Sequence, residues 1–372
     1  MLIGVPKEVK NHEYRVGLTP SSVRELTSHG HTVLVEHNAG AGIGATDSAY
    51  EKAGATMAGT AAEVFARADM IVKVKEPQAA ERAMLRQDQI LFTYLHLAPD
   101  PDQCRDLVNS GAVCIAYETV TQSGGGLPLL APMSEVAGRM SIQAGAYCLE
   151  RAHGGMGVLL GGVAGVPPAQ IVILGAGVVG TNAAQMAVGT GAQVVVMDRS
   201  VDALRRIDRL LGARVMTIFS NRDNVEAQVL SADLVIGGVL IPGAAAPKLV
   251  TREMVRAMKP GSVIVDVAID QGGCCETAHA TTHADPTYVV DEVVHYCVAN
   301  MPGGVPRTST YALNNATLPF VLQLAEHGWK KALATNVHLR NGLNVCRGHV
   351  TYREVAEALG LAYQAPEAAI AA

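Results

Sequence analysis

One short stretch constrains the fold of this chain more than any other: residues 171–180 read Ile-Val-Ile-Leu-Gly-Ala-Gly-Val-Val-Gly. An apolar run typical of a buried strand ends in the pattern G-x-G-x-x-G, and a helical pattern of small residues follows. In this pattern the first glycine permits a tight turn, the second lets the backbone approach a pyrophosphate, and the third lets the helix pack close to the strand. We therefore predict a dinucleotide-binding βαβ unit with these roles for Gly175, Gly177 and Gly180.

The second strand of this unit supports the same interpretation. An apolar run over 194–197 ends at Asp198, roughly twenty residues beyond the motif. A carboxylate there can accept both ribose hydroxyls and repels a 2′-phosphate, so the sequence favours NAD over NADP. Glycine-rich turns also occur in βα connections that bind no nucleotide. The flanking strands, the helix and the acidic residue together favour a cofactor site here.

The composition narrows the class of protein. A length of 372 residues predicts two domains. Only 17% of the residues are charged and 49% are hydrophobic, which suits buried parallel sheets and indicates an oligomer. A net charge of −5 argues against a nucleic-acid partner. Because the sequence opens without a signal-peptide pattern and has no long apolar run, we expect a cytoplasmic protein with no membrane partner.

The cysteines do not indicate a specific function. Seven cysteines occur at irregular spacing, which is typical of reduced thiols in the cytoplasm. The adjacent pair Cys274 and Cys275 could be redox-active or bind metal, but no second Cys or His pair at zinc-ligand spacing accompanies it. We therefore predict no metal site.

Predicted strands and helices alternate along the chain, the rhythm of βαβ units. A glycine-rich break at 124–128 marks a boundary, and the tail from 308 onward reads as helical and as returning to the first domain. The expected fold class is α/β, with two Rossmann-like doubly wound domains and a cleft between them. The expected domains are a discontinuous substrate domain, residues 1–128 and 309–372, and an NAD-binding domain, residues 129–308.

Four polar residues follow predicted strands, where open α/β sheets bind their ligands. Each has a simpler reading: Arg15 and Lys75 as solvated charges, His96 as a core histidine, and Asp270 as a turn cap. Together they form a plausible site for an amino acid or an oxo acid. Arg15 can hold a carboxylate bidentately, and Lys75 can polarise a carbonyl or bind the same carboxylate. His96 can pass a proton to or from the substrate, and Asp270 can orient or activate the water that attacks an imine.

Long segments of the chain closely resemble the family of bacterial NAD-dependent L-alanine dehydrogenases. The matching segments are IGVPKEVKNHEYRV at 3–16, TYLHLA at 93–98, PMSEVAGRM at 132–140, GGVAGV at 161–166, DVAIDQGGC at 266–274, NMPGGVPRTST at 300–310 and ALNNATLP at 312–319.

The resemblance implies reversible oxidative deamination of L-alanine to pyruvate and ammonium, with hydride transfer to NAD, in a homohexamer. It assigns substrate binding to Arg15 and Lys75, with Met133 near the small substrate side chain and Asn300 close by, and makes His96 and Asp270 the acid–base pair. The residues that it implies for the dinucleotide site are Ser134, Gly175, Gly177, Val178, Val179, Gly180, Asp198, Ser220, Val239, Leu240, Val267, Ala268, Ile269, Asp270, Val298, Asn300 and Met301.

One position departs from the family pattern. Ala203 stands where the family often has a basic residue. Additional binding of the adenosine part of the cofactor by a side chain at this position is therefore in doubt, unless Arg199 or Arg205 takes over that role. Two alternatives stay open at this point. The chain could be the NAD(H)-binding subunit of a proton-translocating transhydrogenase, a similar family that needs membrane partners, or a catalytically silent NAD-binding sensor or structural protein. The presence of Arg15, Lys75, His96 and Asp270 together argues against both alternatives.

Overall fold

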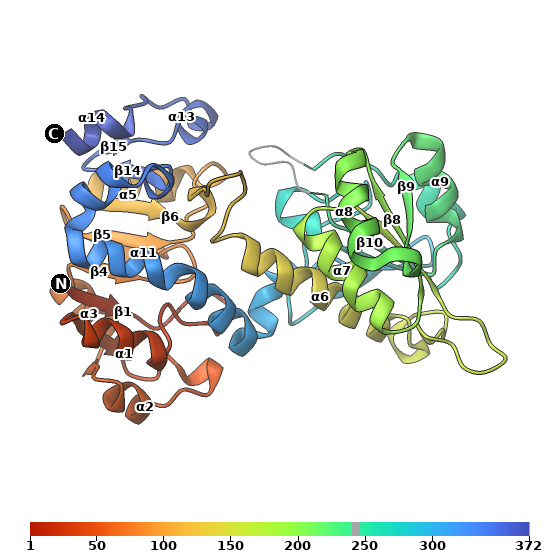
Figure 1. The fold of residues 1–372 in the computed structure, drawn as a ribbon, viewed down its shortest axis with the longest axis horizontal. Coiled ribbons are helices and arrows are strands. Elements are labelled where there is room, and N and C mark those ends of the chain that lie inside the picture. The colour runs from red at the N-terminus through yellow and green to blue at the C-terminus, as the bar shows by residue number, and fades with distance from the viewer. Residues whose placement is uncertain (240–245, 372) are drawn as a thin grey trace. The chain divides into compact units, whose positions relative to one another are not determined.

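The computed structural model describes residues 1–239 and 246–371. The chain divides into two compact units, Met1–Met133 with Gly303–Ala372, and Ser134–Pro302. Figure 1 shows both chain ends in the first unit, which is therefore built from the two ends of the sequence. Helix α6 (Ala131–Cys148) begins in the last residues of one unit and continues into the other.

The first unit is built on a sheet of eight strands within the described residues, ordered β15-β14-β6-β5-β4-β1-β2-β3. The six strands from β3 to β6 are parallel, and their order reverses direction between β1 and β4. Ligands bind outside the carboxyl ends of parallel strands at such a switch point. The strands are β1 (Leu2–Val5), β2 (Thr32–Glu36), β3 (Thr56–Ala58), β4 (Met70–Val72), β5 (Ile90–Thr93), β6 (Val113–Ala116), β14 (Leu343–Cys346) and β15 (His349–Val350).

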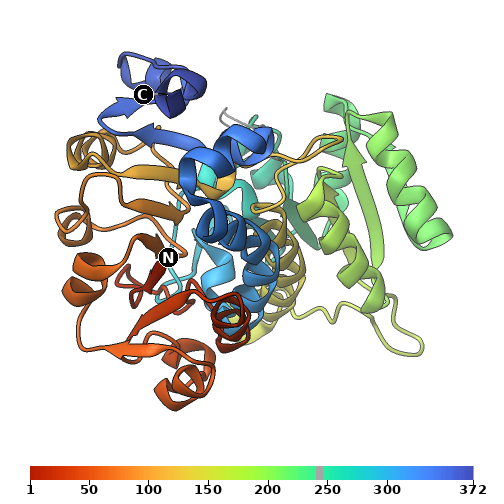
Figure 2. The same ribbon diagram turned by 60° about the vertical axis from the view of Figure 1, so that its left-hand side comes forward.

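Helices connect these strands, as βαβ crossovers require (Figure 2). Several begin where a Thr or Asp side chain accepts a hydrogen bond from the first helical turn, as Thr19, Thr46, Thr60 and Asp100 do. The helices are α1 (Pro20–Ser28), α2 (Asp47–Lys52), α3 (Ala61–Arg67), α4 (Ala79–Arg82), α5 (Pro101–Ser110), α11 (Pro306–Thr335), α12 (Val337–Arg340), α13 (Arg353–Leu359) and α14 (Pro366–Ala371).

The C-terminal tail is not entirely helical, so that expectation was wrong. Strand β14 extends the first sheet antiparallel to β6, and β15 pairs antiparallel with β14. Every residue of β14 is buried, but a run of four residues is too short for periodicity to separate a strand from a loop or helix. The long helix α11 also begins earlier than expected, and Gly328, with φ +69°, interrupts it.

The second unit has seven strands in its described residues, ordered β12-β13-β11-β10-β7-β8-β9, and all pairs except β12–β13 are parallel. This is the strand order of dinucleotide-binding folds, and it reverses between β7 and β10. The strands are β7 (Gln170–Leu174), β8 (Gln193–Asp198), β9 (Met216–Phe219), β10 (Leu234–Gly237), β11 (Val263–Asp266), β12 (Thr287–Val290) and β13 (Val293–Tyr296).

Helices cover both faces of this second sheet. Alternate residues of β7 point to opposite faces, because side chains alternate along a strand. Ile171 and Ile173 lie in a cluster with the small residues of α7, whereas Val172 and Leu174 join a cluster with α9 and α10. Besides α6, the α-helices of this unit among the described residues are α7 (Val178–Gly189), α8 (Val201–Leu211), α9 (Arg222–Ser231) and α10 (Arg252–Ala257).

Candidate active site

In the first unit, three of the four predicted charged residues follow neighbouring strands. Arg15 lies in the segment after β1, Lys75 follows β4, and His96 follows β5. These strands are adjacent in the order β5-β4-β1, so the residues share the carboxyl edge at the switch point. The structure therefore brings the guanidinium, the ammonium and the imidazole of the predicted quartet to one edge of one sheet.

Arg15 is a buried cation, only 2% exposed, and not the solvated surface charge of the simpler reading. Its Nε and Nη2 atoms donate to the two carboxylate oxygens of Glu13, at 2.6 and 2.5 Å, and Nη1 donates to Met133 Sδ at 3.0 Å. Burial alone would lower the pKa of Arg15, but the Glu13 carboxylate outweighs it and the pKa is raised. Arg15 therefore stays charged, with Met133 beside it.

His96 is held in an unusual backbone conformation. Its φ is +50°, a left-handed value uncommon for residues other than glycine. The backbone N–H groups of Leu95 and His96 both donate to the Glu118 carboxylate, at 3.1 and 2.6 Å to Oε1. The ring stacks on Tyr94 and its side chain is 43% exposed, so His96 is accessible and not a core histidine.

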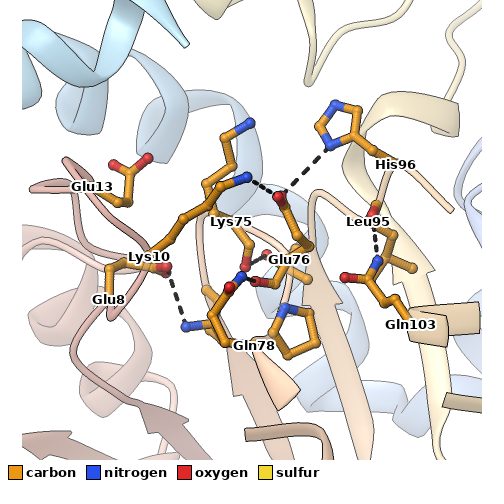
Figure 3. Close-up of polar contacts among 12 residues, drawn as sticks. Glu8, Lys10, Glu13, Lys75, Glu76, Gln78, Leu95, His96 and Gln103 are labelled. Atoms are coloured by element: carbon orange, nitrogen blue, oxygen red, sulfur yellow. Dashed lines mark hydrogen bonds and ion pairs between the residues drawn. The ribbon is translucent and has the colours of Figure 1, made fainter. Parts of the chain in front are cut away.

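Lys75 is half-buried, and the next residue is a carboxylate that contacts His96. Glu76 forms an ion pair with Lys10, and its Oε2 lies 3.8 Å from His96 Nδ1. Burial raises the pKa of Glu76, but His96, Lys75 and Lys10 together hold it well below the usual range. Figure 3 shows Lys10, Lys75, Glu76 and His96 gathered at this edge of the sheet.

A second lysine nearby has a structural role that the sequence did not reveal. Lys73 is fully buried and contacts two buried carboxylates, Glu8 at 3.2 Å and Glu81 at 2.6 Å. Glu8 also accepts the backbone N–H of Val74 at 2.7 Å, just beyond the end of β4 at Val72. These contacts fix the chain that leads to Lys75. The only sequence signal was a charged residue inside an otherwise apolar run.

In the second unit, the glycine turn between β7 and α7 has the geometry that its motif predicts. Gly175 has φ +103°, which requires glycine, and a Cβ on Gly180 would lie 1.7 Å from the Gly175 carbonyl oxygen. A Cβ on Gly177 would meet no atom within 4 Å, so packing does not explain that glycine. The N-terminus of α7 begins at this turn, and backbone N–H groups at such a helix end can bind a phosphate.

Asp198 lies against this turn. Its Oδ2 accepts the N–H of Ala176, between the first two motif glycines, at 2.7 Å, and its Oδ1 accepts the N–H of Ser200 at 2.7 Å. The carboxylate is only partly buried at the end of β8. The residues present therefore fit the adenosine half of a dinucleotide.

Asp270 lies in the second unit, on a short 3-10 helix (Val267–Gln271) that follows β11, and its side chain is exposed. The buried carboxylate of Asp266 anchors this loop by accepting N–H groups of Ala268, Cys274 and Cys275, at 3.1, 2.8 and 3.1 Å. Sequence analysis did not single out Asp266. Asp266 ends a buried strand, and this position is the feature of the sequence that could have identified it.

The other predicted cofactor residues also belong to the second unit, and Leu240 lies outside the described residues. Val179 and Ile269 are buried, whereas Val178 is exposed on the first turn of α7. Asn300 has φ +61°, and its carbonyl oxygen contacts His283 Nε2 at 3.1 Å. The remaining positions are Ser134 in α6, Ser220 after β9, Val239 after β10, Val267 and Ala268 after β11, and the buried Val298 and Met301 after β13.

The two unexplained sequence features have structural roles. Ala203 is buried in α8, where its N–H donates to the helix cap Ser200, and Arg205 pairs with Asp202. Cys274 and Cys275 are buried, and burial raises the pKa of both thiols. No group of three or more metal-ligating side chains is present among the described residues. Across the same residues, no helix has both the length and the apolar character needed to cross a membrane.

Comparison with known proteins places the two parts of the chain in one family. The family model "Alanine dehydrogenase/PNT, N-terminal domain" matches residues 4–137, and the model of the corresponding C-terminal domain matches residues 141–353. The alanine dehydrogenase of Halomonas elongata is 60% identical over 363 residues, which cover 98% of each chain.

Two solved structures extend the comparison. An L-alanine dehydrogenase superposes with a TM-score of 0.94 at 54% identity, covering 97% of this chain and 99% of the other. A transhydrogenase from Sinorhizobium meliloti has a TM-score of 0.81 at 29% identity, covering 95% and 99%. The α/β fold with two domains is therefore shared with both.

Proposed function

The chain belongs to the alanine dehydrogenase/PNT family, and we propose that it uses its first unit to bind the substrate and its second unit to bind NAD. It is an L-alanine dehydrogenase, which catalyses the reversible oxidative deamination of L-alanine to pyruvate and ammonium. The observation that carries the proposed division is the gathering of Arg15, Lys75 and His96 at one switch point, β1/β4, and of the glycine turn and Asp198 at another, β7/β10.

In the first unit, we propose that Arg15 and Lys75 hold the substrate. Glu13 takes the Nε and Nη2 side of the Arg15 guanidinium, so the substrate carboxylate would meet the Nη1 side. Met133 contacts that same Nη1, which would place the thioether next to the small side chain of alanine. Lys75 would bind the same carboxylate or polarise the carbonyl of pyruvate. Asn300 of the second unit is the further proposed substrate contact.

The proton transfers fall to His96 and Asp270. His96 would exchange a proton with the substrate nitrogen or oxygen, because an imidazole can both accept and donate near neutral pH. Asp270 would orient or activate the water that attacks the imine. NAD, when bound, accepts the hydride from the substrate carbon, so the chain's own residues bind, orient and move protons.

The fit of the second unit to NAD rests on its turn and on Asp198. The backbone at Gly177 and the N-terminus of α7 would face the pyrophosphate, and Asp198 the adenosine ribose. The other positions implied by the resemblance would line the rest of the cofactor. We further propose a cytoplasmic homohexamer. The family resemblance supports this, and so does the high hydrophobic content of 49%.

The transhydrogenase alternative is less supported. The solved transhydrogenase is 29% identical to this chain, compared with 54% for the solved L-alanine dehydrogenase. Arg15, Lys75 and His96 also lie together at one edge of the first sheet, and this set of groups suits a small oxo acid. A silent NAD-binding protein would have no use for a buried, charged Arg15.

The test is to measure oxidation of NADH and of NADPH in the presence of pyruvate and ammonium. We expect turnover with NADH that requires both substrates, and much lower turnover with NADPH. The variant Asp198→Ala should reduce the NADH-to-NADPH ratio of kcat/KM, and the ratio is the proper readout because Ala176 also loses its hydrogen-bond acceptor. Absence of pyruvate-dependent turnover would contradict the substrate assignment, and an unchanged ratio would contradict the ribose assignment.

A further inference from the structure

Glu76 is a buried carboxylate with its two oxygens in different environments. Oε1 forms the ion pair with Lys10, whereas Oε2 is buried and has no hydrogen-bond partner among the described residues. His96 Nδ1 lies 3.8 Å from this Oε2 atom. The Glu76 side chain is 14% exposed and the Lys10 side chain 37%.

This separation is too long for a hydrogen bond but short enough for an electrostatic pair. A buried acceptor without a partner is costly, so a small approach of the ring, or its protonation, would satisfy Oε2. The pKa of Glu76 lies well below its usual range despite burial, because of His96, Lys75 and Lys10. The carboxylate is therefore negative throughout the range in which a histidine titrates.

Among the described residues, the contacts of His96 involve its backbone N–H, the face of its ring and Nδ1. Glu118 holds the backbone N–H of His96, and the Tyr94 ring stacks on the imidazole with centroids 5.7 Å apart. Figure 3 shows Nδ1 turned toward Glu76 and the other ring nitrogen pointing away from it. The charged groups near the ring are thus Glu76 and Glu118, with Lys75 and Lys10 acting on Glu76.

We propose that Glu76 is a positioning residue for His96, which fixes Nδ1 as the protonated nitrogen and stabilises the imidazolium, and that Lys10 limits this stabilisation. The proposal rests on the proposed acid–base role of His96. When His96 takes a proton from the substrate on Nε2, the ring gains one positive charge, and Nδ1–H faces the Glu76 carboxylate. A carboxylate behind a histidine acts in this way in catalytic triads.

The proposal predicts opposite effects for two charge removals. In Glu76→Gln the imidazolium loses its counter-charge, so His96 should lose its proton at a lower pH. In Lys10→Met the Glu76 charge is less compensated, so His96 should keep its proton to a higher pH. The opposite directions of the two shifts are the result that distinguishes this role. If the two substitutions only disturbed the local structure, the shift in the pH at which His96 loses its proton would not have opposite signs in the two variants.

The measurement is the pH dependence of His96 modification by diethyl pyrocarbonate, which attacks neutral imidazole, followed by peptide mass spectrometry of the full chain. It does not require turnover. Glu63→Gln is the matched control, because it also removes one carboxylate from an ion pair, with Arg67 on the exposed surface of α3. The midpoint for His96 should not move in this control.

Steady-state kinetics complete the test. Glu76→Gln should lower kcat by about tenfold, with a smaller change in the KM for pyruvate, and should shift the pH profile of kcat in the same direction as the modification midpoint. Midpoints that stay fixed, or that move in the same direction in both variants, would overturn the proposal. Opposite midpoint shifts with unchanged turnover would support the Glu76 contact and instead overturn the proposed catalytic role of His96.

Discussion

At the scale of single residues, carboxylates decide how the charged groups of the first unit are held. Glu13 binds Arg15, Glu118 binds the backbone of His96, and Glu76 faces the ring of His96. Each of these carboxylates holds in position a cation or a proton-carrying residue that would otherwise be mobile or solvated. The chemistry that we propose therefore depends also on residues outside the set to which we assign substrate binding and proton transfer.

His96→Ala tests the proton carrier itself. Turnover should fall by at least about a hundredfold, the usual scale for loss of a general acid or base. Binding of NADH, measured by fluorescence titration, should survive, because the glycine turn and Asp198 belong to the second unit. Near-normal turnover would remove His96 from the mechanism.

At the scale of elements, glycine lets the start of α7 lie directly against the turn that follows β7. Gly180→Ala should displace α7 from the turn, because the new Cβ would lie 1.7 Å from the Gly175 oxygen. We expect NADH to bind at least about tenfold more weakly, since overpacking of this kind costs about 1–3 kcal/mol. Isothermal titration calorimetry with NADH measures the loss.

Gly189→Ala is the matched control for that substitution. Gly189 lies at the other end of α7, and a Cβ there would meet no atom within 4 Å. Alanine also favours a helix over glycine, so binding should be unchanged and stability equal or slightly higher. Equal NADH affinity in the two variants would show that the close contact at Gly180 is unimportant.

Strand β13 carries a histidine that makes stability depend on pH. His295 is fully buried, donates from Nδ1 to the Val293 carbonyl at 2.9 Å, and accepts from Thr277 at Nε2. Burial lowers its pKa below the ordinary 6.5, so the unfolded chain binds more protons than the folded chain as the pH falls below that value. The folded state should therefore lose stability in this range.

Thermal unfolding of the wild type and of His295→Asn over a pH series measures this contribution. The wild-type Tm should fall as the pH drops from neutrality toward about 5, and the variant, although less stable at neutral pH, should lose less over the same interval. Parallel pH dependence in the two proteins would show that His295 does not cause the loss.

Sequence reasoning succeeded at this scale where spacing determines geometry. The glycine motif, Asp198 and the βαβ rhythm fix local turns and strands, so both parallel cores were predictable. It failed where contacts depend on strand order. Lys73 meets Glu8 because β4 lies next to β1, and β14 is a strand because β6 offers it an edge. The local spacing of residues in the sequence predicts neither pairing.

At the scale of the whole molecule, two sheets with the same reversal of strand order carry different residues at their switch points. The reversal in the first unit, at β1/β4, carries Arg15 and Lys75, with His96 on the next strand. The reversal in the second, at β7/β10, carries the glycine turn. We infer that the same arrangement of strands serves the substrate in the first unit and the cofactor in the second.

The most direct measurement of that claim follows the hydride itself. L-alanine carrying deuterium at C2 is incubated with NAD and the protein, and the products are analysed by mass spectrometry. We expect NADH that contains the deuterium, together with pyruvate and ammonium in equal amounts. Unlabelled NADH, or no reduction of NAD by L-alanine while hydride passes between two nucleotides, would contradict it.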